Sequence, residues 1–377
     1  YLREFFTSAV AEGSKDLVKN YVFGDETDPS RNRLFLQFLL DHKIKVYENT
    51  ADLSAAGQSF KKGSSWVVPT KQPQYRMVRT MFEYVTTFAD SVFYDASAWT
   101  MAAAYGMPFS AAPTAKVGTE LKEVTLATHT FPQGDAYAYL IDWRDYYAPK
   151  LLFELQKAGV HVEAIHQNFS SQTQDGKVDF SRGTLMIPMG FQSLAKSEVV
   201  QQLKTLAQKN GQKVYAVQTG LNLSGIDLGS NSVSAVQHPK VVLVVGTGIN
   251  ASEAGEIWNL LDHQIGMPIT KVNMEQFGRL NLHGYNTLIL PSGSYGALGE
   301  SQVNHLKDWV SRGGTIISMK NASLWLNQKG ITKEEAVAGN EGKSPTILPF
   351  ATRSDAEGAK EVGGSIYLAE LDLTHPI

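Results

Sequence analysis

The chain has 377 residues and a formal net charge of −3, with 43 % hydrophobic and 19 % charged residues. This composition is typical of a folded globular protein of two or three domains. No block of basic residues is present, so the sequence lacks the electrostatic footprint of a nucleic-acid-binding protein. No apolar run approaches the ~20 residues that a membrane-spanning helix needs, and we expect no membrane span.

Cysteine is absent from the sequence. Disulfides, thiolate zinc sites and a cysteine nucleophile are therefore excluded within this chain, and the composition is compatible with an oxidising compartment. The chain begins at Tyr1, without an initiator Met or a signal-peptide pattern, and ends abruptly at Ile377. We expect it to be a piece of a longer polypeptide.

Residues 1–130 are predicted to form a first α/β lobe that ends in the extended stretch 118–134. Asp28 is placed to cap a helix whose first residue is Pro29, a position that tolerates proline. The predicted elements, in chain order, are a helix within 1–19, strands at 21–23, 44–47 and 65–68, and helices that begin at Pro29 and after Gln72.

The same order recurs in residues 131–236, which we predict to be a second α/β lobe and a repeat of the first. Its predicted elements are a strand at 136–141, a helix from Pro149, strands at 160–162 and 185–187, and a helix after Gln192. Both copies share a Phe-x-x-Gly motif, an apolar strand, a proline and a glutamine. These positions are Phe60, Gly63, Pro69 and Gln72 in the first copy, and Phe180, Gly183, Pro188 and Gln192 in the second. Chance similarity of two α/β units is the alternative.

Residues 237–377 are predicted to form the third lobe, which follows a polar run at 224–238. Continuous apolar runs at 241–245, 288–290 and 315–317 alternate with helix-like segments, which indicates parallel strands buried on both faces. Ligands of such sheets bind outside the carboxyl ends of the strands. We therefore select a candidate ligand site there: Gly246, Gly248, Ser292, Gly293, Ser294, Tyr295, Lys320 and Asn321.

The turn after the first of these strands, Gly246-x-Gly248-x-x-Ala251, resembles a dinucleotide-binding turn. Glu275 is the candidate for the acid that binds the ribose. The alternative, which we favour, is an ordinary tight turn between a strand and a helix.

The segment Leu290-Pro291-Ser292-Gly293 resembles the loop that holds backbone N–H donors in class I glutamine amidotransferase-like domains. In that family the next strand ends in a sharp turn that bears a Cys nucleophile. The corresponding segment here, 318–322, contains Lys320 and no Cys, and no Gly-x-Ser-x-Gly motif surrounds Ser318. His375 faintly resembles the family's His partner. We interpret the third lobe as an amidotransferase-like domain that lacks its nucleophile.

The predicted fold class is α/β, with three flavodoxin-like or amidotransferase-like lobes whose mainly parallel sheets are flanked by helices. The nine histidines show no zinc-binding spacing, since His161 and His166 flank a strand and point to opposite faces. We predict neither a metal nor a cofactor in this chain. Asp142, Arg144 and Asp145 follow a strand end, and an ion pair that caps the next helix is favoured over a polar site.

With these residues in view, nearly all of the chain resembles the region that follows the peptidase domain in large, secreted bacterial proteins of the zinc carboxypeptidase (carboxypeptidase A-like) family. The resemblance is carried by scattered identities: Tyr21-Val22-Phe23-Gly24-Asp25, Phe60-x-x-Gly63-Ser64-x-x-Val67-Val68-Pro69-x-x-Gln72-Pro73, Phe93-Tyr94-Asp95-Ala96-Ser97-Ala98-Trp99-Thr100, Gly255-Glu256-Ile257-Trp258 and Leu371-Asp372-x-Thr374-His375-Pro376.

In that family the peptidase activity lies upstream, in a domain with a His-x-x-Glu zinc motif and a distant His. This chain has neither, so no catalytic residue is carried over, and the resemblance implies zinc only in an upstream domain. It implies a secreted or periplasmic accessory region whose partners are the upstream peptidase domain and a peptide or glycan substrate. The alternative is a hydrolase or a small-molecule-binding domain that uses the carboxyl ends of the third-lobe strands.

Overall fold

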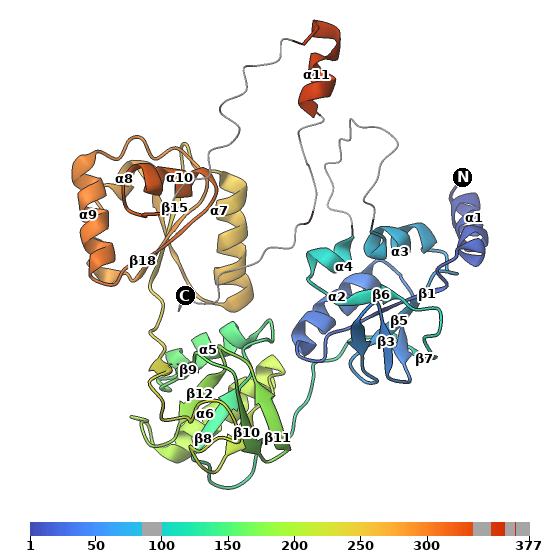
Figure 1. The fold of residues 1–377 in the computed structure, drawn as a ribbon, viewed down its shortest axis with the longest axis horizontal. Coiled ribbons are helices and arrows are strands. Elements are labelled where there is room, and N and C mark those ends of the chain that lie inside the picture. Colours follow the sequence, from blue (N-terminus) through green and yellow to red (C-terminus); the bar gives the residue numbers. More distant parts are fainter. Residues whose placement is uncertain (85–99, 335–347, 359–365, 367–377) are drawn as a thin grey trace.

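The computed structural model describes residues 1–84, 100–334, 348–358 and 366. These residues form a mixed α/β protein that contains two five-stranded sheets, one four-stranded sheet and two hairpins. Each of the larger sheets carries its own helices (Figure 1). We number the lobes by the order of these sheets along the chain.

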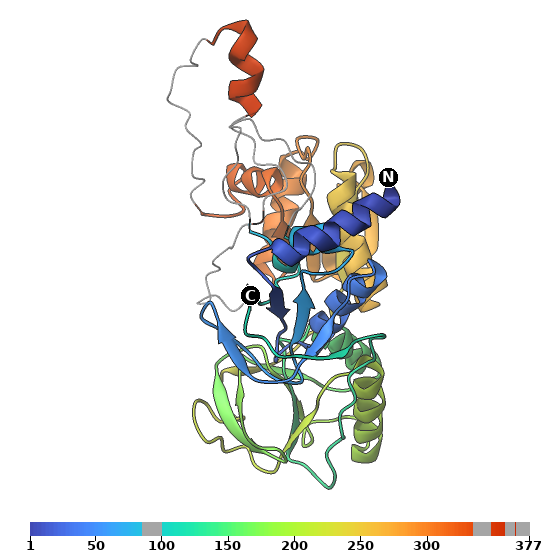
Figure 2. The ribbon, with the colours of Figure 1, turned by 90° about the vertical axis from the view of Figure 1, so that its right-hand side faces the viewer.

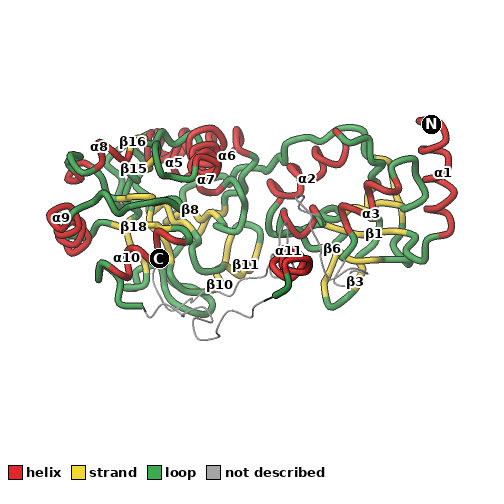
Figure 3. Tube along the Cα trace, turned by 90° about the horizontal axis from the view of Figure 1, so that it is seen from above, coloured by secondary structure: helices red, strands yellow, loops and turns green. Residues whose placement is uncertain are grey.

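The first sheet has the strand order β6-β1-β5-β2-β7, and every neighbouring pair is antiparallel. Its strands are β1 (Asn20–Phe23), β2 (Tyr47–Asn49), β5 (Trp66–Pro69), β6 (Phe109–Ala111) and β7 (Val117–Glu120), and a hairpin is formed by β3 (Leu53–Ala55) and β4 (Gln58–Phe60). The helices of this lobe are α1 (Leu2–Lys15), α2 (Pro29–Asp41), α3 (Tyr75–Phe82) and α4 (Met101–Ala104). Helix α1 lies at the outer end of the lobe (Figures 2 and 3).

The second sheet has the order β13-β8-β12-β9-β14, again with only antiparallel pairs. Its strands are β8 (Ala138–Ile141), β9 (Glu163–Ile165), β12 (Leu185–Pro188), β13 (Tyr215–Val217) and β14 (Val233–Ala235), with a hairpin of β10 (Phe169–Thr173) and β11 (Gly176–Phe180). The helices are α5 (Ala148–Lys157) and α6 (Lys196–Asn210).

The first two sheets have equivalent topologies. Replacing β1, β2, β5, β6 and β7 by β8, β9, β12, β13 and β14 converts one strand order into the other. The hairpins occupy equivalent places in the chain. Two glutamines make equivalent contacts: Gln72 bonds the backbone N–H and C=O of Lys45, and Gln192 bonds those of His161.

These glutamines correct the predicted start of two strands. Strands were predicted at 44–47 and 160–162, but β2 begins at Tyr47 and β9 at Glu163. In each lobe one residue two positions before the strand, Lys45 or His161, has its backbone N–H and C=O bonded to a glutamine amide. The N–H···Oε1 distances are 2.7 Å from Lys45 to Gln72 and 2.9 Å from His161 to Gln192. Alternating apolar residues alone cannot distinguish a side-chain amide from a neighbouring strand as the partner.

The prediction of mainly parallel sheets is wrong for the first two lobes. The central strands are buried on both faces because helices cover one face and the hairpin covers the other. Leu140 and Met186 pack with Phe169 and Phe180 of the β10–β11 hairpin, whereas Tyr139 packs on the helical side. A strand covered in this way reads as a continuous apolar run, as a buried parallel strand does.

The third sheet confirms the prediction of parallel strands, with the order β16-β15-β17-β18. Its strands are β15 (Val241–Val245), β16 (Thr270–Asn273), β17 (Thr287–Leu290) and β18 (Thr315–Ser318). The helical elements of the lobe are α7 (Ala251–Trp258), the π-helix η1 (Asn259–Ile265), α8 (Met274–Phe277), the 3₁₀-helix η2 (Leu282–Gly284), α9 (Glu300–Ser311) and α10 (Asn321–Gln328). A further helix, α11 (Phe350–Gly358), follows in the chain.

Helix α5 of the second lobe joins the core of the third. Phe153 of α5 is buried in one cluster with Val241, Leu243 and Ile289 of the parallel sheet. None of the helices in the described part of the chain combines the length and hydropathy that a bilayer-spanning segment requires. His375, the candidate for a catalytic His partner, lies outside the described residues.

Candidate functional site

The carboxyl ends of β15, β17 and β18 converge as the sequence predicts for a parallel sheet. The backbone N–H of Ser294 donates to Gly248 O at 2.8 Å, and that of Asn250 donates to Ser292 O at 2.8 Å. Glycine is needed in this contact, because a Cβ atom on Gly293 would lie 2.7 Å from Gly248 O. The two loops therefore touch through their backbones.

Asn321 connects the β17 loop to the start of α10. Its Oδ1 accepts from the Gly293 N–H at 2.9 Å, and its Nδ2 donates to Gly293 O at 3.1 Å. A side-chain amide thus satisfies both backbone polar groups of Gly293. Asn321 acts here as a brace for the loop.

Glu253 occupies the centre of the site. It lies in the first turn of α7, where its backbone N–H donates to the Asn250 side chain at 3.0 Å. Its carboxylate accepts from the Ser292 N–H at 2.7 Å and from the Ser292 hydroxyl at 3.0 Å, and it forms an ion pair with Lys320 Nζ at 2.6 Å. One carboxylate thereby links the loops that follow all three strands.

Sequence reasoning missed Glu253, although its position carried a signal. Asn250 and Glu253 have the spacing of a capping box, in which the acidic side chain returns to the backbone of its own helix N-cap. In the structure the carboxylate turns instead to Ser292 and Lys320, partners that lie far away in the sequence. Only the juxtaposition of three strand ends identifies these partners.

The ion pair holds both groups in their charged forms. The hydrogen bond from Lys320 and then that from the Ser292 backbone lower the pKa of Glu253, and the hydrogen bond to Glu253 raises the pKa of Lys320. A nucleophilic lysine must lose its proton, and an effective carboxylate base needs a raised pKa. The two pKa shifts therefore disfavour Lys320 as a nucleophile and Glu253 as a base at neutral pH.

The turn after β18 is strained at Lys320. This residue has a φ of 48° and a ψ of −120°, a backbone conformation that side chains other than glycine rarely adopt. The sharp turn between strand and helix places the side chain at its tip. Lys320 stands there with a 73 % exposed side chain, held by Glu253, whose side chain is 11 % exposed.

The remaining predicted site residues do not join this cluster. Tyr295 is 1 % exposed, its hydroxyl donates to Pro291 O at 2.6 Å, and its ring lies 5.3 Å from that of Trp325, so it belongs to the core. Burial raises the pKa of Tyr295. Gly246 faces Asn273, whose Oδ1 would lie 2.9 Å from an added Cβ atom.

A dinucleotide is disfavoured at the Gly246 turn. The Glu253 carboxylate occupies the first turn of α7, where the fingerprint would place a pyrophosphate, and like charges repel. The predicted ribose acid, Glu275, lies in the short helix α8.

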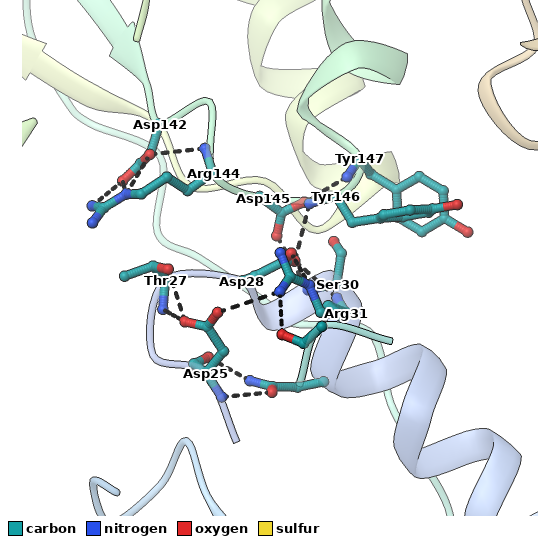
Figure 4. A network of polar contacts seen from close by, with 12 residues as sticks. Asp25, Thr27, Asp28, Ser30, Arg31, Asp142, Arg144, Asp145, Tyr146 and Tyr147 are labelled. Carbon is teal, nitrogen blue, oxygen red and sulfur yellow. Dashed lines mark hydrogen bonds and ion pairs between the residues drawn. The ribbon is translucent and has the colours of Figure 1, made fainter. Parts of the chain in front are cut away.

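A second polar network joins the first two lobes (Figure 4). Asp28 of the first lobe accepts from the Tyr146 N–H at 3.0 Å, and Asp145 of the second accepts from the Ser30 N–H at 3.1 Å. Both aspartates end an Asp-x-x-Asp motif, Asp25-x-x-Asp28 after β1 and Asp142-x-x-Asp145 after the equivalent strand β8. The cross-lobe contacts are therefore reciprocal, as expected for two equivalent lobes that face one another.

The structure assigns different roles to the polar residues after β8. Asp142 and Arg144 form the predicted ion pair, in which Arg144 Nε lies 3.0 Å from each carboxylate oxygen. Asp145 Oδ1 accepts from the N–H of Tyr147, the N-cap residue of α5, at 2.8 Å, and its Oδ2 accepts from the first turn of α2 in the other lobe. The prediction that Asp28 caps α2 before Pro29 is confirmed, with an Arg31 N–H···Oδ1 distance of 2.8 Å.

Within the described ranges, no group of three or more His, Asp or Glu residues has a geometry that could hold a metal ion. His161 Nε2 contacts Glu163 at 3.1 Å, and His166 Nε2 contacts the Ser234 hydroxyl at 2.7 Å. Comparisons of the chain with models of protein families, with curated proteins and with solved structures found no match.

Proposed function

We propose that this chain is a non-catalytic accessory region of a secreted or periplasmic zinc carboxypeptidase-like protein. In this role it docks on the upstream peptidase domain, orients it or restricts access to it, or binds part of its substrate. Zinc belongs to that upstream domain. The observation that carries the non-catalytic part of the proposal is the three-way contact of Glu253 with Ser292 and Lys320.

This contact occupies the groups that a catalytic site at the strand ends would need to have available for its substrate. A backbone N–H at a strand end can stabilise an oxyanion only if it is free to do so. Here the Ser292 N–H is bonded to a carboxylate of the same chain, and the same carboxylate binds the ammonium group at the strained turn. Donor and candidate nucleophile are each engaged in the folded chain.

The third lobe fits this role as an amidotransferase-like domain without its nucleophile. Numbered along the chain, its strands have the spatial order 2-1-3-4, which is also the order in flavodoxin-like sheets. Such folds host many functions, so the fold alone indicates no activity. The residues at the strand ends therefore carry the argument.

The first experiment assays residues 1–377 with chromogenic esters, anilides and glutamine. We expect no turnover above the uncatalysed rate, either for the wild type or for Glu253→Ala, in which the Ser292 N–H is released. Turnover by the wild type that Ser292→Ala or Lys320→Ala abolishes would overturn the non-catalytic assignment.

The second experiment deletes this region from the longer protein. We expect a changed kcat/KM of the peptidase towards large or folded substrates, because docking and access act on the whole substrate. An intact peptidase whose activity, specificity and stability are unchanged by the deletion would contradict the accessory role.

The strained turn at Lys320 favours a second candidate function, since backbone strain clusters at ligand sites. In this alternative the strand ends bind a small molecule or hydrolyse a substrate. A thermal-shift screen with nucleotides and small carboxylates tests it, because a ligand at about 100 times its Kd stabilises the folded state by ~2.7 kcal/mol.

A further inference from the structure

A cleft of about 780 Å³ lies where the three lobes meet. Its walls are formed by α2 and α4 of the first lobe, by the segment before α5 of the second, and by α7 and η1 of the third. Pockets for small ligands have volumes of about 300–1,000 Å³ and occur preferentially between domains. The cleft is distinct from the strand ends at which Glu253 and Lys320 meet.

Two junctions define the position of the walls. The buried ring of Phe153 fixes α5 to the core of the third lobe. The reciprocal contacts of Asp28 and Asp145 fix the second lobe to the first. Because the same second lobe takes part in both junctions, the first and third lobes are held on either side of the cleft.

The wall formed by the first two lobes is held in place by hydrogen bonds and an ion pair. Asp28 is completely buried, and its carboxylate accepts from the Tyr146 N–H at 3.0 Å and pairs with Arg31 Nε at 2.8 Å. A single buried charge therefore positions two residues that line the cleft (Figure 4). Arg31 also donates to Gly106 O at 2.8 Å, so its guanidinium is already compensated and held.

Aromatic rings supply the apolar part of this wall. Tyr146 is 41 % exposed and lies edge-on to Tyr147, with a ring-centroid distance of 5.2 Å. Tyr105 packs against Phe35 and Phe38 and also lines the cleft. Tyrosine rings at such a surface offer an apolar face together with a polar hydroxyl.

The opposite wall contains an unusual backbone. Residues Asn259–Ile265 form a π-helix, an arrangement that is rare and frequent at functional sites. Asn259 and Gln264 of this helix, and Glu256 of α7, line the cleft. Among the described residues, no hydrogen bond or ion pair engages their side chains. The wall thus presents two amides and one carboxylate that have no hydrogen-bond partner among the described residues.

This chemistry distinguishes between ligand classes. The arginine is neutralised by Asp28, so the cleft has no uncompensated cation for a phosphate or a carboxylate. An extended peptide usually binds along a free strand edge or in an apolar groove, whereas these walls are helical and carry amides. A neutral ligand with many hydroxyl groups and apolar faces matches amides, a carboxylate and tyrosine rings.

We propose that this cleft binds a neutral oligosaccharide, with Tyr146 and Tyr105 against the sugar rings and with Asn259, Gln264 and Glu256 bonded to hydroxyl groups. The proposal does not depend on the accessory role, since a glycan site would serve a free-standing protein equally well. Failure of the peptidase-deletion experiment would therefore leave it intact.

Isothermal titration calorimetry of residues 1–377 with maltohexaose, cellohexaose, xylohexaose and chitohexaose tests the proposal. We expect one of them to bind with a Kd at or below the millimolar range, and with little dependence on salt because the ligand is uncharged. Tyr146→Ala should weaken binding about tenfold, which equals ~1.4 kcal/mol, whereas Tyr146→Phe should retain most of it.

Matched controls separate the cleft from general effects. Asn259→Ala should weaken binding severalfold. Two control variants should leave binding unchanged: Asn304→Ala, which removes an exposed amide from α9, and Tyr137→Ala, which removes an exposed tyrosine outside the cleft. Far-ultraviolet circular dichroism checks that each variant is folded. The proposal would be overturned if none of the oligosaccharides binds, or if the control variants weaken binding as much as the cleft variants do. Displacement of a bound oligosaccharide by neutral peptides would also overturn it.

Discussion

Single side chains fix local backbone in places where strands would otherwise begin. Gln72 is 3 % exposed and makes three hydrogen bonds, to Lys45 N–H, Lys45 O and Pro69 O. Gln192 repeats this set with His161 and Pro188. A glutamine amide has both a donor and an acceptor, so it can replace a neighbouring strand at one residue. This explains why a glutamine follows the equivalent proline, Pro69 or Pro188, in both lobes.

Replacement of Gln72 by alanine tests this role. We expect a loss of about 1–3 kcal/mol in the free energy of unfolding, because three backbone groups lose their partner. Gln37→Ala removes an exposed amide that bonds Asp41 and should change stability by less than ~0.5 kcal/mol. Urea denaturation measures both variants, and equal effects would show that the Gln72 amide has no special role.

At the scale of elements, the backbone conformation of the turn between β18 and α10 is set by its surroundings and not by the conformational preference of its residues. Lysine occupies a backbone conformation that glycine adopts at lower cost, while its side chain reaches Glu253 of α7. An exposed ion pair contributes little to stability, so it does not explain the strain. The geometry is imposed by the sheet and by the packing of α10, in which Trp325 and Leu326 are buried.

Two variants separate strain from the ion pair at this turn. Lys320→Ala removes the ion pair and keeps the strain, whereas Lys320→Gly removes both. We therefore expect the glycine variant to have the higher thermal-unfolding midpoint. In helix α9 the order should reverse, with Lys307→Gly less stable than Lys307→Ala by about 1 kcal/mol. The same order at both positions would refute strain at Lys320.

At the scale of the whole molecule, the interface between the first two lobes contains a histidine, His129, whose pKa is lowered. His129 precedes the second sheet and lines a cleft of about 410 Å³ between these lobes. Its Nε2 is buried, with no hydrogen-bond partner in the described part of the chain. Burial, followed by the nearby charge of Lys213, lowers the pKa of His129 below its ordinary value.

The lowered pKa predicts the pH dependence of folding. The folded state binds the His129 proton less readily than the unfolded state, so the contribution of this residue to stability is fully present above pH ~6.5 and falls as the pH decreases through the folded-state pKa. His129→Gln should therefore lose less stability than the wild type between pH 7.5 and 5.5. Lys213→Gln should act in the same direction. Parallel pH profiles for wild type and His129→Gln in urea titrations would contradict the prediction.

The sequence was informative wherever local chemistry decides the structure. The cap at Asp28, the proline at the start of α2 and the parallel strands of the third lobe follow from residue type and periodicity, and the structure confirms them. The candidate site was found in part. Ser292, Gly293, Lys320 and Asn321 converge because the ends of parallel strands share one edge of the sheet. Tyr295 is buried in the core instead, and polarity in a sequence does not reveal which face of a loop is buried.

The amino-acid sequence by itself determined helices, turns and the presence of buried strands, because these depend on neighbours along the chain. Tertiary structure alone decided which way the strands run in the first two lobes, since a hairpin layer buries them as thoroughly as a second layer of helices would. It also decided that Glu253 occupies the donor at Ser292 and that Asp28 serves two lobes at once. These contacts join residues 39 and 118 positions apart, and no periodicity extends over such distances.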